Sequence, residues 1–321
     1  MEKLAIGIDL GGTNLKGIIL NEKGEGRHLT RTPTEAQKGG AHVLNNILNL
    51  IEILISKEGS AKNIIGVGIG TPGFVDEDGT VSGAENLPGW KGTRLYDRIS
   101  EKFDFKVTAA NDVTVATMAE AKYGAGQGVR NLVFFALGTG IGGGIVIDHH
   151  LYKGTHGMAG ELGHIVVETN GIPCNCGLNG CVERYASATG IVNLAHKLCA
   201  ETNDTTPFVL EVKKDPSAVS SKMVYDFVKQ NDPVANQVNE IACEMLARAI
   251  GITLNTLSPD RVVLGGGVMM AGQVIIDTVS KYVPKHCWPI IWEKCDLVIA
   301  KLGEDAGVLG AAGMVFDEFG S

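Results

Sequence analysis

Short apolar runs that end in glycine recur along the chain, and each predicts a buried strand followed by a tight turn. Residues 4–10 form the first run, and a Gly-Gly-Thr turn leads from it into a second apolar run. The segment 131–148 repeats this order, with its glycine-rich turn at 137–144. Two units of one design in a single chain suggest an internal duplication.

Helical and strand-like segments fill most of the remaining chain. Apolar or small residues at helical spacing predict helices at 40–57, 113–124, 188–200, 234–257 and 302–316. Strand-like runs lie at 64–76, 106–110, 261–269 and 298–302. The polar segment 201–215 carries little signal and is expected to be a connection. Cys199 and Cys243 lie on helical stretches, so we expect both in the core.

The composition is that of an ordinary soluble globular protein. The chain has 321 residues, 44% hydrophobic and 20% charged, and its length suggests two domains. A formal charge of −8 without a Lys/Arg block argues against nucleic acid as the main partner. No apolar run approaches the roughly 20 residues of a membrane span, and a strand-like run at the start leaves no room for a signal peptide. Seven cysteines, three of them clustered, fit a reducing cytosol, so we expect a cytoplasmic protein.

A cluster of thiols in the middle of the chain predicts a metal site. The cluster consists of His164, Cys174, Cys176 and Cys181. Thiolate and imidazole are the ligands that tetrahedral zinc prefers, so these residues can close one Cys3His site. Gly177 and Gly180 would let the loop fold back sharply. The alternatives are three free thiols beside a core histidine or, with less support, a disulfide.

Polar side chains beside this cluster suggest a second binding function. Glu161 and His164 precede the thiols, and Glu183 follows them. A closed four-ligand site leaves no open position for chemistry, so the metal is expected to be scaffolding that aims these side chains at another molecule. Two carboxylates and an imidazole would suit a small polyol. The alternative is that both glutamates lie on a solvated surface.

The glycine turns are candidate phosphate-binding loops, because glycine lets backbone N–H groups come close to an anion. The candidate residues are Asp9, Gly11, Gly12, Thr13 and Lys16 around the first turn, and Gly138, Thr139 and Gly140 in the second. A plain hairpin explains the first turn equally well, and one glycine loop alone is weak evidence. The paired design favours two loops for one nucleotide. The glycines after residue 264 form a third place where backbone could approach a ligand, or merely a tight turn.

Two other strand ends carry candidate ligand-binding side chains. Asn86 and Trp90 lie in the aperiodic loop 84–92, and such loops often hold ligands, although many are only connections. Asn111 and Asp112 follow the strand at 106–110 and precede a helix, which is where α/β folds place ligands. Asp112 could also be a simple helix N-cap, and the two roles are compatible.

Taken together, these motifs resemble the ROK family of sugar kinases, which has the actin/hexokinase-like ATPase fold. The resemblance covers nearly the whole chain. It is carried by DLGGTNLK (9–16), NLPGW (86–90), AND (110–112), LGTGIGGG (137–144), ELGH (161–164), CNCGLNGCVE (174–183) and LGGG (264–267). The zinc signature with ELGH is the specific part. The cysteine spacing is similar to that of the glucokinase and N-acetylhexosamine kinase branch.

The resemblance implies a role for each candidate residue in an ATP-dependent phosphorylation of glucose. Asp112 would be the general base that takes the proton from the 6-hydroxyl of the sugar. The sugar hydroxyls would be held by Asn86, Asn111, Glu161, His164 and Glu183. The ATP phosphates would be held by Gly11, Gly12, Thr13, Gly138, Thr139 and Gly140, with Gly265 and Gly266 near the adenosine. Asp9 would orient Mg²⁺ through water, and His164 would also be a ligand of the structural Zn²⁺.

The resemblance also implies the architecture and the partners. Two duplicated α/β domains would have a cleft between them: a small one of residues 1–115 plus 303–321, and a large one of residues 116–302. The partners would be a small-molecule sugar and further copies of the chain in a homodimer or larger assembly. Phosphoryl transfer needs mainly positioning and charge stabilisation, which backbone donors, Mg²⁺ and one aspartate can supply.

Other functions stay open at this point. N-acetylglucosamine or N-acetylmannosamine could replace glucose, because motifs do not show the pocket volume beside the 2-position. ROK repressors share this core but place a helix-turn-helix domain ahead of the first phosphate loop, and Asp9 lies too near the start of the chain for one. A non-catalytic module that binds zinc and sugar is the remaining alternative. Asp112 and the two phosphate loops argue against it.

Overall fold

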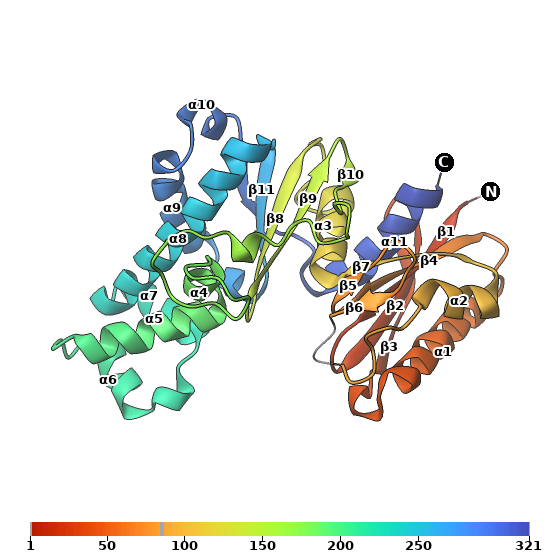
Figure 1. Cartoon of the computed structure of the whole chain (residues 1–321), viewed down its shortest axis with the longest axis horizontal. Coiled ribbons are helices and arrows are strands. Elements are labelled where there is room, and N and C mark those ends of the chain that lie inside the picture. Colours follow the sequence, from red (N-terminus) through yellow and green to blue (C-terminus); the bar gives the residue numbers. More distant parts are fainter. Residues whose placement is uncertain (1, 84–86, 321) are drawn as a thin grey trace. The chain divides into compact units, whose positions relative to one another are not determined.

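The computed structural model describes residues 2–83 and 87–320, and the chain forms two compact units (Figure 1). Unit 1 comprises Met1–Val129, Gly144–Gly160 and Lys301–Ser321, and unit 2 comprises Arg130–Gly143 and Glu161–Ala300. Residues 116–129 and 144–160 therefore belong to unit 1. The division into functional halves at residues 115 and 303 stays a prediction.

Unit 1 contains a five-stranded sheet in the order β3-β2-β1-β4-β7. Its strands are β1 (Leu4–Leu10), β2 (Asn14–Asn21), β3 (Gly26–Pro33), β4 (Ile64–Thr71) and β7 (Lys106–Asn111), and a small hairpin is formed by β5 (Phe74–Val75) and β6 (Val81–Ser82). Strands β1, β4 and β7 run parallel, so their carboxyl ends meet at one edge. Asp9 pairs with Gly70 and Asn111 with Thr71 at this edge.

Helices cover both faces of the first sheet. They are α1 (Gly40–Glu58), α2 (Leu95–Phe103), α3 (Asp112–Tyr123) and α11 (Ala306–Phe319). Successive residues of a strand face opposite sides, so Ile8 packs in the core with α1 while Gly7 faces α11. A Cβ atom on Gly7 would lie 2.1 Å from the backbone oxygen of Val308, and one on Gly68 would lie 1.8 Å from that of Ala311. Glycine in these strands lets the small-residue helix α11 lie directly against the sheet.

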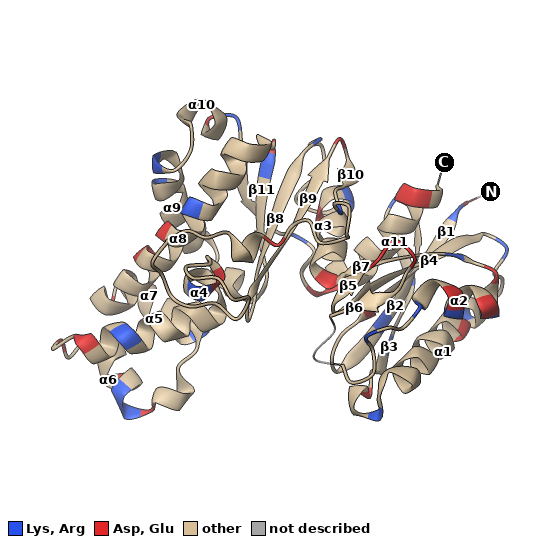
Figure 2. Ribbon diagram, in the orientation of Figure 1, with Lys and Arg blue, Asp and Glu red and all other residues tan. Residues whose placement is uncertain are grey.

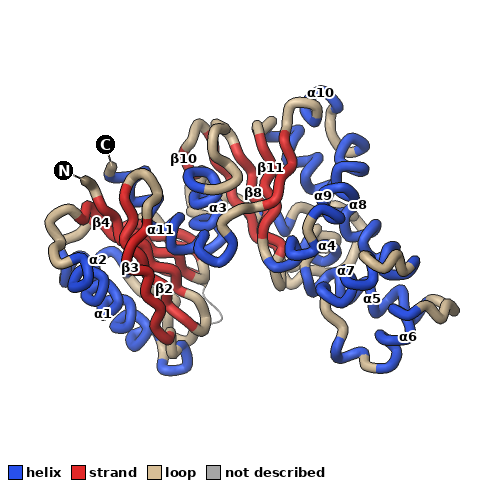
Figure 3. The backbone as a smooth tube through the Cα atoms, turned by 180° about the vertical axis from the view of Figure 1, so that it is seen from behind, coloured by secondary structure: helices blue, strands red, loops and turns tan. Residues whose placement is uncertain are grey.

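The second sheet, most of which lies in unit 2, has the order β10-β9-β8-β11-β12. Its strands are β8 (Leu132–Leu137), β9 (Ile141–Ile147), β10 (His150–Leu151), β11 (Arg261–Gly265) and β12 (Asp296–Ile299). Strands β8, β11 and β12 run parallel, and β9 pairs antiparallel with β10. This order repeats that of the first sheet strand for strand, which confirms the predicted α/β class and the duplication. Figure 3 shows the strands of the two sheets in red.

Helices form the rest of unit 2. They are α4 (Glu183–Ala186), α5 (Ala188–Glu201), α6 (Pro207–Lys214), α7 (Ser221–Val228), α8 (Pro233–Leu257), α9 (Gln273–Tyr282) and α10 (Pro289–Trp292). The long helix α8 supplies many residues of one large apolar core that also includes the second sheet. Cys199 and Cys243 are buried in this core, as predicted.

One predicted connection is wrong, and two predicted strands have other bounds: the strand expected at 261–269 is β11, which ends at Gly265 and is followed by the 3-10 helix η4 (Gly267–Ala271). The segment 201–215, expected to be a connection, contains helix α6, which begins after Thr206 and buries Phe208 completely. The strand expected at 298–302 is β12, which ends at Ile299. The backbone N–H groups of Lys301 and Leu302 donate to the carboxylate of Glu120 at 2.9 and 2.8 Å, so they are not available to a strand ladder.

The surface charge is mixed. The formal charge of −8 comes from acidic and basic side chains that are interspersed over both units (Figure 2). In residues 2–83 and 87–320, no helix combines the length and the apolar character that crossing a bilayer requires.

Candidate active site and metal centre

The first glycine turn, which joins β1 to β2, is held in place by Thr34. This threonine is fully buried; its hydroxyl donates to the Gly11 carbonyl at 2.6 Å and its N–H donates to the Thr13 carbonyl at 2.9 Å. A Cβ atom on Gly12 would meet no atom within 4 Å, so the turn is open on that side. No motif marks Thr34, and sequence analysis therefore missed it.

Asp9 and Asp112 stand at the ends of the parallel strands beside this turn. Burial raises the pKa of Asp9. The positive charge of Lys16 lowers this pKa, and the nearby Asp112 carboxyl raises it. Desolvation also raises the pKa of Asp112, against a hydrogen bond from the Val113 N–H at 2.8 Å. Lys16 pairs with Asp9 across β1 and β2, and its Nζ donates to the Glu304 carbonyl at 2.7 Å. Unit 1 thus holds two carboxyl groups with raised pKa beside a glycine turn.

Asn111 is the residue that caps helix α3. Its Oδ1 accepts from the Val113 N–H at 3.0 Å, and its Nδ2 donates to the Gly73 carbonyl at 3.1 Å. Asp112 is the first residue of the helix, and it is exposed to solvent on one side although the surrounding protein desolvates its carboxyl enough to raise the pKa. The capping role that the sequence left open for Asp112 therefore belongs to its neighbour, and the Asp112 carboxyl is accessible to a ligand.

The loop at 84–92 is described only from Leu87 onward. Asn86 lies outside the described residues, so its predicted role stays a prediction. Trp90 is fully buried, and its indole N–H donates to the Thr71 hydroxyl at 2.8 Å. Trp90 is consequently a core residue of unit 1.

The second glycine turn, residues 138–140, is tied to the beginning of helix α5. The Gly138 carbonyl accepts from the Ala188 N–H at 2.8 Å, and the Thr139 carbonyl accepts from the Thr189 hydroxyl at 2.8 Å. Ser187 caps the same helix. Sequence analysis missed the contribution of α5; the available signal was a serine directly before a helical pattern.

Glu183, the first residue of α4, lies against this second turn. Its Oε2 accepts from the Ile141 N–H at 2.9 Å. A Cβ atom on Gly140 would lie 2.4 Å from the same oxygen, so glycine makes room for the carboxylate. The glutamate that was predicted to hold a sugar is thus also in contact with a predicted phosphate loop.

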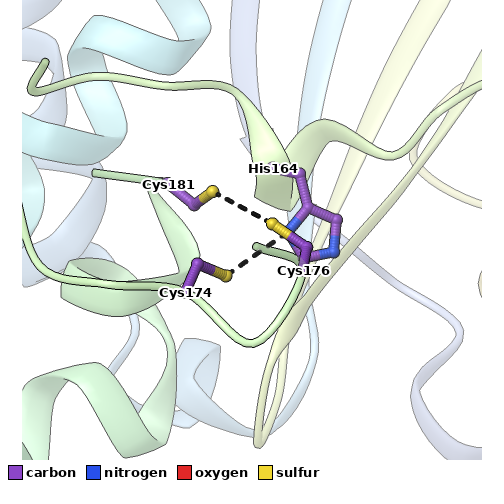
Figure 4. Close-up of side chains that lie close together, drawn as sticks. All are labelled: His164, Cys174, Cys176 and Cys181. Carbon is purple, nitrogen blue, oxygen red and sulfur yellow. Dashed lines mark hydrogen bonds between the residues drawn. The ribbon is translucent and has the colours of Figure 1, made fainter. Parts of the chain in front are cut away.

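The four predicted metal ligands converge in unit 2 (Figure 4). Their ligand atoms all lie within 4.8 Å of one another, and they belong to His164, Cys174, Cys176 and Cys181. The Sγ atoms of Cys176 and Cys181 are 3.6 Å apart, and Cys174 Sγ is 3.7 Å from His164 Nδ1. Thiolates bound at 2.3 Å to a tetrahedral zinc ion are about 3.8 Å apart. The donor set and its spacing therefore fit one such ion.

Glycines shape the loop that carries the thiols. Gly177 and Gly180 have φ values of 93° and 78°, which confirms the two predicted sharp turns. A Cβ atom on Gly180 would lie 1.7 Å from the backbone oxygen of Glu168. Arg248 of α8 in turn holds that segment, because its Nη1 donates to the Val167 carbonyl at 3.2 Å and lies 3.3 Å from the Glu168 carboxylate.

His164 connects the thiol cluster to the neighbouring carboxyl groups. Its Nδ1 faces Cys174, and its Nε2 is 3.9 Å from Glu161 Oε2. Burial raises the pKa of Glu161, His164 lowers it, and the Glu183 carboxylate raises it again. Glu161, His164 and Glu183 therefore lie together. A metal on Nδ1 would leave Nε2 to hydrogen-bond a carboxylate or a ligand.

A cavity of about 290 Å³ in unit 2 begins just beyond the glycines predicted to lie near adenosine. Gly265 and Gly266 pack against β8: Cβ atoms there would lie 2.7 Å from the Phe134 ring and 2.5 Å from the Leu137 oxygen. Gly267 borders the cavity and has open space at its Cβ position. The opposite wall is formed by α7 and the residue after it, with Tyr225, Asp226 and Lys229 among the lining residues.

Comparison with known proteins places almost the whole chain within one family. A model of the ROK family matches residues 5–318. The glucokinase of Halalkalibacterium halodurans is 36% identical over 313 residues, which cover 97% of this chain and 94% of the relative. The glucokinase of Thermotoga maritima is 33% identical over 317 residues, covering 98% of each. The xylose repressor of Bacillus subtilis is 27% identical and matches 98% of this chain and 77% of its own length.

Solved structures give the same result. A ROK hexokinase from Thermus thermophilus superimposes with a TM-score of 0.82 at 26% identity, covering 99% of both chains. A ROK family glucokinase from Streptomyces griseus, in complex with glucose and AMPPNP, has a TM-score of 0.73 at 29% identity, covering 97% of this chain and 98% of that one. The similarity thus extends through both units.

Proposed function

The chain belongs to the ROK family and has the actin/hexokinase-like ATPase fold, and from this premise we propose that it is an ATP-dependent kinase for the 6-hydroxyl of glucose. The observation that carries the proposal is the accessible Asp112 carboxyl with its raised pKa, at a strand end beside Asp9 and a glycine turn. The two glucokinases that match over nearly their full length support glucose as the substrate.

Asp112 acts as the general base in this proposal. Its carboxylate accepts the proton of the 6-hydroxyl while that oxygen bonds to the γ-phosphorus of ATP. The bond from the γ-phosphorus to the bridging oxygen breaks, and ADP leaves. A pKa raised by desolvation makes the carboxylate a better proton acceptor. Such assistance typically contributes about 10²–10⁴ in rate.

The two glycine turns bind the phosphates of ATP. Backbone N–H groups at residues 12–13 and 139–140 donate to the phosphate oxygens, whereas those of Gly11 and Gly138 donate to the Asn14 and Gly140 carbonyls within the turns. Thr34 and the first turn of α5 keep the turns in shape. Asp9 would hold Mg²⁺ through water, and the ion would neutralise phosphate charge. Lys16 adds a positive charge. The cavity beside Gly267 receives the adenine, and its size suits a flat ring system.

A structural zinc ion is held by the three thiolates and by His164 Nδ1. The close approach of the four ligand atoms and the Cys3His donor set support this assignment. Zinc supplies no chemical step here. It fixes the His164 ring, so that Nε2 and the adjacent Glu161 and Glu183 can hold sugar hydroxyls together with Asn111 and the predicted Asn86.

We extend the proposal to the setting of the enzyme. It works in the cytoplasm on a small-molecule sugar, as a homodimer or larger assembly of identical chains. The net charge is negative, and basic side chains are interspersed with acidic ones over the described surface, which argues against nucleic acid as a partner.

Two alternatives are separated from this proposal by experiment. Within the kinases, N-acetylglucosamine or N-acetylmannosamine would replace glucose if the site beside the 2-position admits an acetamido group. In a different class, the match to the xylose repressor of Bacillus subtilis favours a sugar-responsive regulator without catalysis.

The test is ADP release with Mg-ATP across glucose, mannose, fructose, N-acetylglucosamine and N-acetylmannosamine. Asp112→Asn is assayed alongside, with Asp104→Asn as a matched control, because Asp104 has a positive φ that asparagine also adopts. Turnover that is strongest on glucose, retained in the control and lost in Asp112→Asn supports the proposal. Preference for an acetylated sugar changes the substrate, and no turnover on any sugar favours the regulator.

A further inference from the structure

A buried carboxylate at the far end of helix α3 has no part in the proposed chemistry. Glu120 is 1% exposed, and its side chain accepts hydrogen bonds only from backbone N–H groups among its described contacts. Oε2 accepts from Ala125 at 2.7 Å and from Lys301 at 3.1 Å, and Oε1 accepts from Lys301 at 2.9 Å and from Leu302 at 2.8 Å. Burying a carboxylate costs free energy unless its oxygens accept hydrogen bonds, so the folded protein has to supply these N–H donors to Glu120.

These bonds join three separate parts of the chain. Ala125 lies in the turn after α3, whereas Lys301 and Leu302 lie about 180 residues later, directly before η6 (Gly303–Asp305) and helix α11. The helices α3 and α11 also pack along each other, so closely that a Cβ atom on Gly310 would lie 1.9 Å from the Val115 oxygen. Glu120 therefore connects the C-terminal end of α3 to residues 301–302, which lead into α11. Helix α11 is the main packing partner of α3.

The same helix begins with Asp112. Glu120 lies eight residues further on, about 12 Å along the helix axis. At the first turn, Asn111 caps the helix and is bonded to the Gly73 carbonyl. The helix is thus held at both ends by side-chain bonds, and a shift or rotation at the Glu120 end moves the Asp112 end as well, because a helix of 12 residues is a stiff rod.

We propose that Glu120 is a positioning residue for the reaction: its carboxylate fixes the axial place and rotation of α3 and thereby the position of the Asp112 carboxyl. This inference rests on the proposed kinase function. Displacement of a reacting group by about 1 Å can cost about 10²-fold in rate, so the proposed effect is measurable.

Glu120→Gln is the closest variant in shape. A carboxamide has one acceptor oxygen, and its NH2 group would face an N–H donor, either that of Ala125 or those of Lys301 and Leu302. We expect kcat per folded molecule to fall by about 10- to 100-fold, while the KM for ATP stays within about twofold. The ATP site is expected to respond less than kcat, because the glycine turns do not contact Glu120 and the segment that Glu120 holds reaches the ATP site only at its edge, where the Glu304 carbonyl accepts from Lys16.

Gly124→Ala perturbs the same carboxylate from outside helix α3. A Cβ atom on Gly124, the residue that follows helix α3, would lie 2.1 Å from Glu120 Oε2. We expect it to lower kcat as Glu120→Gln does. In a Glu120→Ala background the carboxylate is absent and only the 3.0 Å approach to the Cα atom of residue 120 remains, so adding Gly124→Ala should lower kcat less than it does in the wild type. This non-additivity distinguishes displacement of the carboxylate from an independent effect of alanine on the turn.

The experiment measures kcat and both KM values for wild type, Glu120→Gln, Glu120→Ala, Gly124→Ala and the double variant, with folded fractions from circular dichroism. Ile47→Val, in the buried core of α1, controls for a general loss of stability. Lowered kcat with unchanged ATP KM and a non-additive double variant supports the proposal. The proposal is overturned if the kcat values of Glu120→Gln and Gly124→Ala lie within about twofold of the wild-type value, whatever their loss of melting temperature.

The design also separates this inference from the proposed function. If wild type turns over a sugar and Asp112→Asn does not, but Glu120→Gln and Gly124→Ala are fully active, only the positioning role fails. If Glu120→Gln does not fold, Gly124→Ala alone decides the question: a lowered kcat at unchanged ATP KM supports the positioning role, and a kcat within about twofold of wild type overturns it. If wild type phosphorylates no sugar, the kinase proposal fails and the role of Glu120 fails with it.

Discussion

The carboxylate of Glu183 accepts a hydrogen bond from the backbone N–H of Ile141 at 2.9 Å, directly after the second glycine turn. In the proposed enzyme, Glu183 binds the sugar and the turn binds ATP phosphates. One side chain would therefore affect both substrates, although the sequence places these residues more than 40 positions apart.

Replacement of Glu183 should weaken the binding of both substrates. Glu183→Ala leaves the Ile141 N–H without its acceptor, and a lost bond to a charged group costs about 1.5–3 kcal/mol. We expect the KM values for ATP and for the sugar each to rise at least about tenfold. Glu183→Gln keeps an oxygen for Ile141 and should raise mainly the sugar KM. Steady-state kinetics checks this, and an unchanged ATP KM in Glu183→Ala would contradict it.

Asp112→Asn should stabilise the protein at neutral pH while it abolishes turnover. Desolvation raises the folded-state pKa of Asp112 above its ordinary value of 3.8, so its ionisation destabilises the folded protein as the pH rises between these two pKa values, and the loss is complete above the folded-state pKa. The gain in Tm should be largest near about pH 7 and should shrink as the pH falls through the folded-state pKa toward about pH 4. Thermal unfolding across this range, with Asp104→Asn as the control, measures it. A Tm gain that grows toward low pH would mean that the folded-state pKa of Asp112 is lowered, and would contradict the prediction.

Removal of the metal should disorder the thiol loop. Metal analysis is expected to give about one zinc per chain, and Cys176→Ser should lose both zinc and sugar affinity. Structural zinc contributes about 10–16 kcal/mol in small zinc domains, so a chelator should increase hydrogen exchange across residues 165–183. Cys295→Ala, which alters a cysteine outside the cluster, should keep the metal. Full activity in a zinc-free protein would refute the scaffolding role.

A larger side chain at Gly267 should interfere with ATP alone. Gly267 borders the 290 Å³ cavity and has open space at its Cβ position, so valine would occupy that space without disturbing the backbone. We expect Gly267→Val to raise the KM for ATP about tenfold, or about 1.4 kcal/mol, and to leave the sugar KM within about twofold. Gln273→Ala, in helix α9 outside the cavity, is the control. Equal effects on both substrates would indicate that the adenine lies elsewhere.

The contact between β4 and α11 should depend on Gly68 and hardly on Gly70. A Cβ atom on Gly68 would lie 1.8 Å from the backbone oxygen of Ala311, whereas one on Gly70 would be in ordinary contact with Val115 at 3.4 Å. Gly68→Ala should therefore lower the free energy of unfolding by about 3 kcal/mol, and Gly70→Ala by less than about 1 kcal/mol. Denaturant unfolding compares the two. Equal midpoints would mean that α11 does not lie this close to the sheet.

The sequence alone predicted the features that depend on near neighbours in the chain. The strand β1, the helix α1, the duplicated strand–turn–strand units and the turns at Gly177 and Gly180 follow from apolar periodicity and from glycine conformational freedom. The Cys3His cluster was predictable because three of its four ligands lie within eight residues. Local sequence patterns predict these features because residues that are near one another along the chain are also near one another in the fold.

Only the tertiary structure decided which distant groups support these motifs. Thr34 holds the first turn from 23 residues away, and the N-terminus of α5 holds the second from about 50. Glu120 reaches amides about 180 residues later and ends the last strand earlier than its apolar pattern suggested. A buried carboxylate or hydroxyl needs hydrogen-bond partners, but any backbone amide can serve. Amides carry no sequence signature, so these partners were identified only when folding brought the segments together.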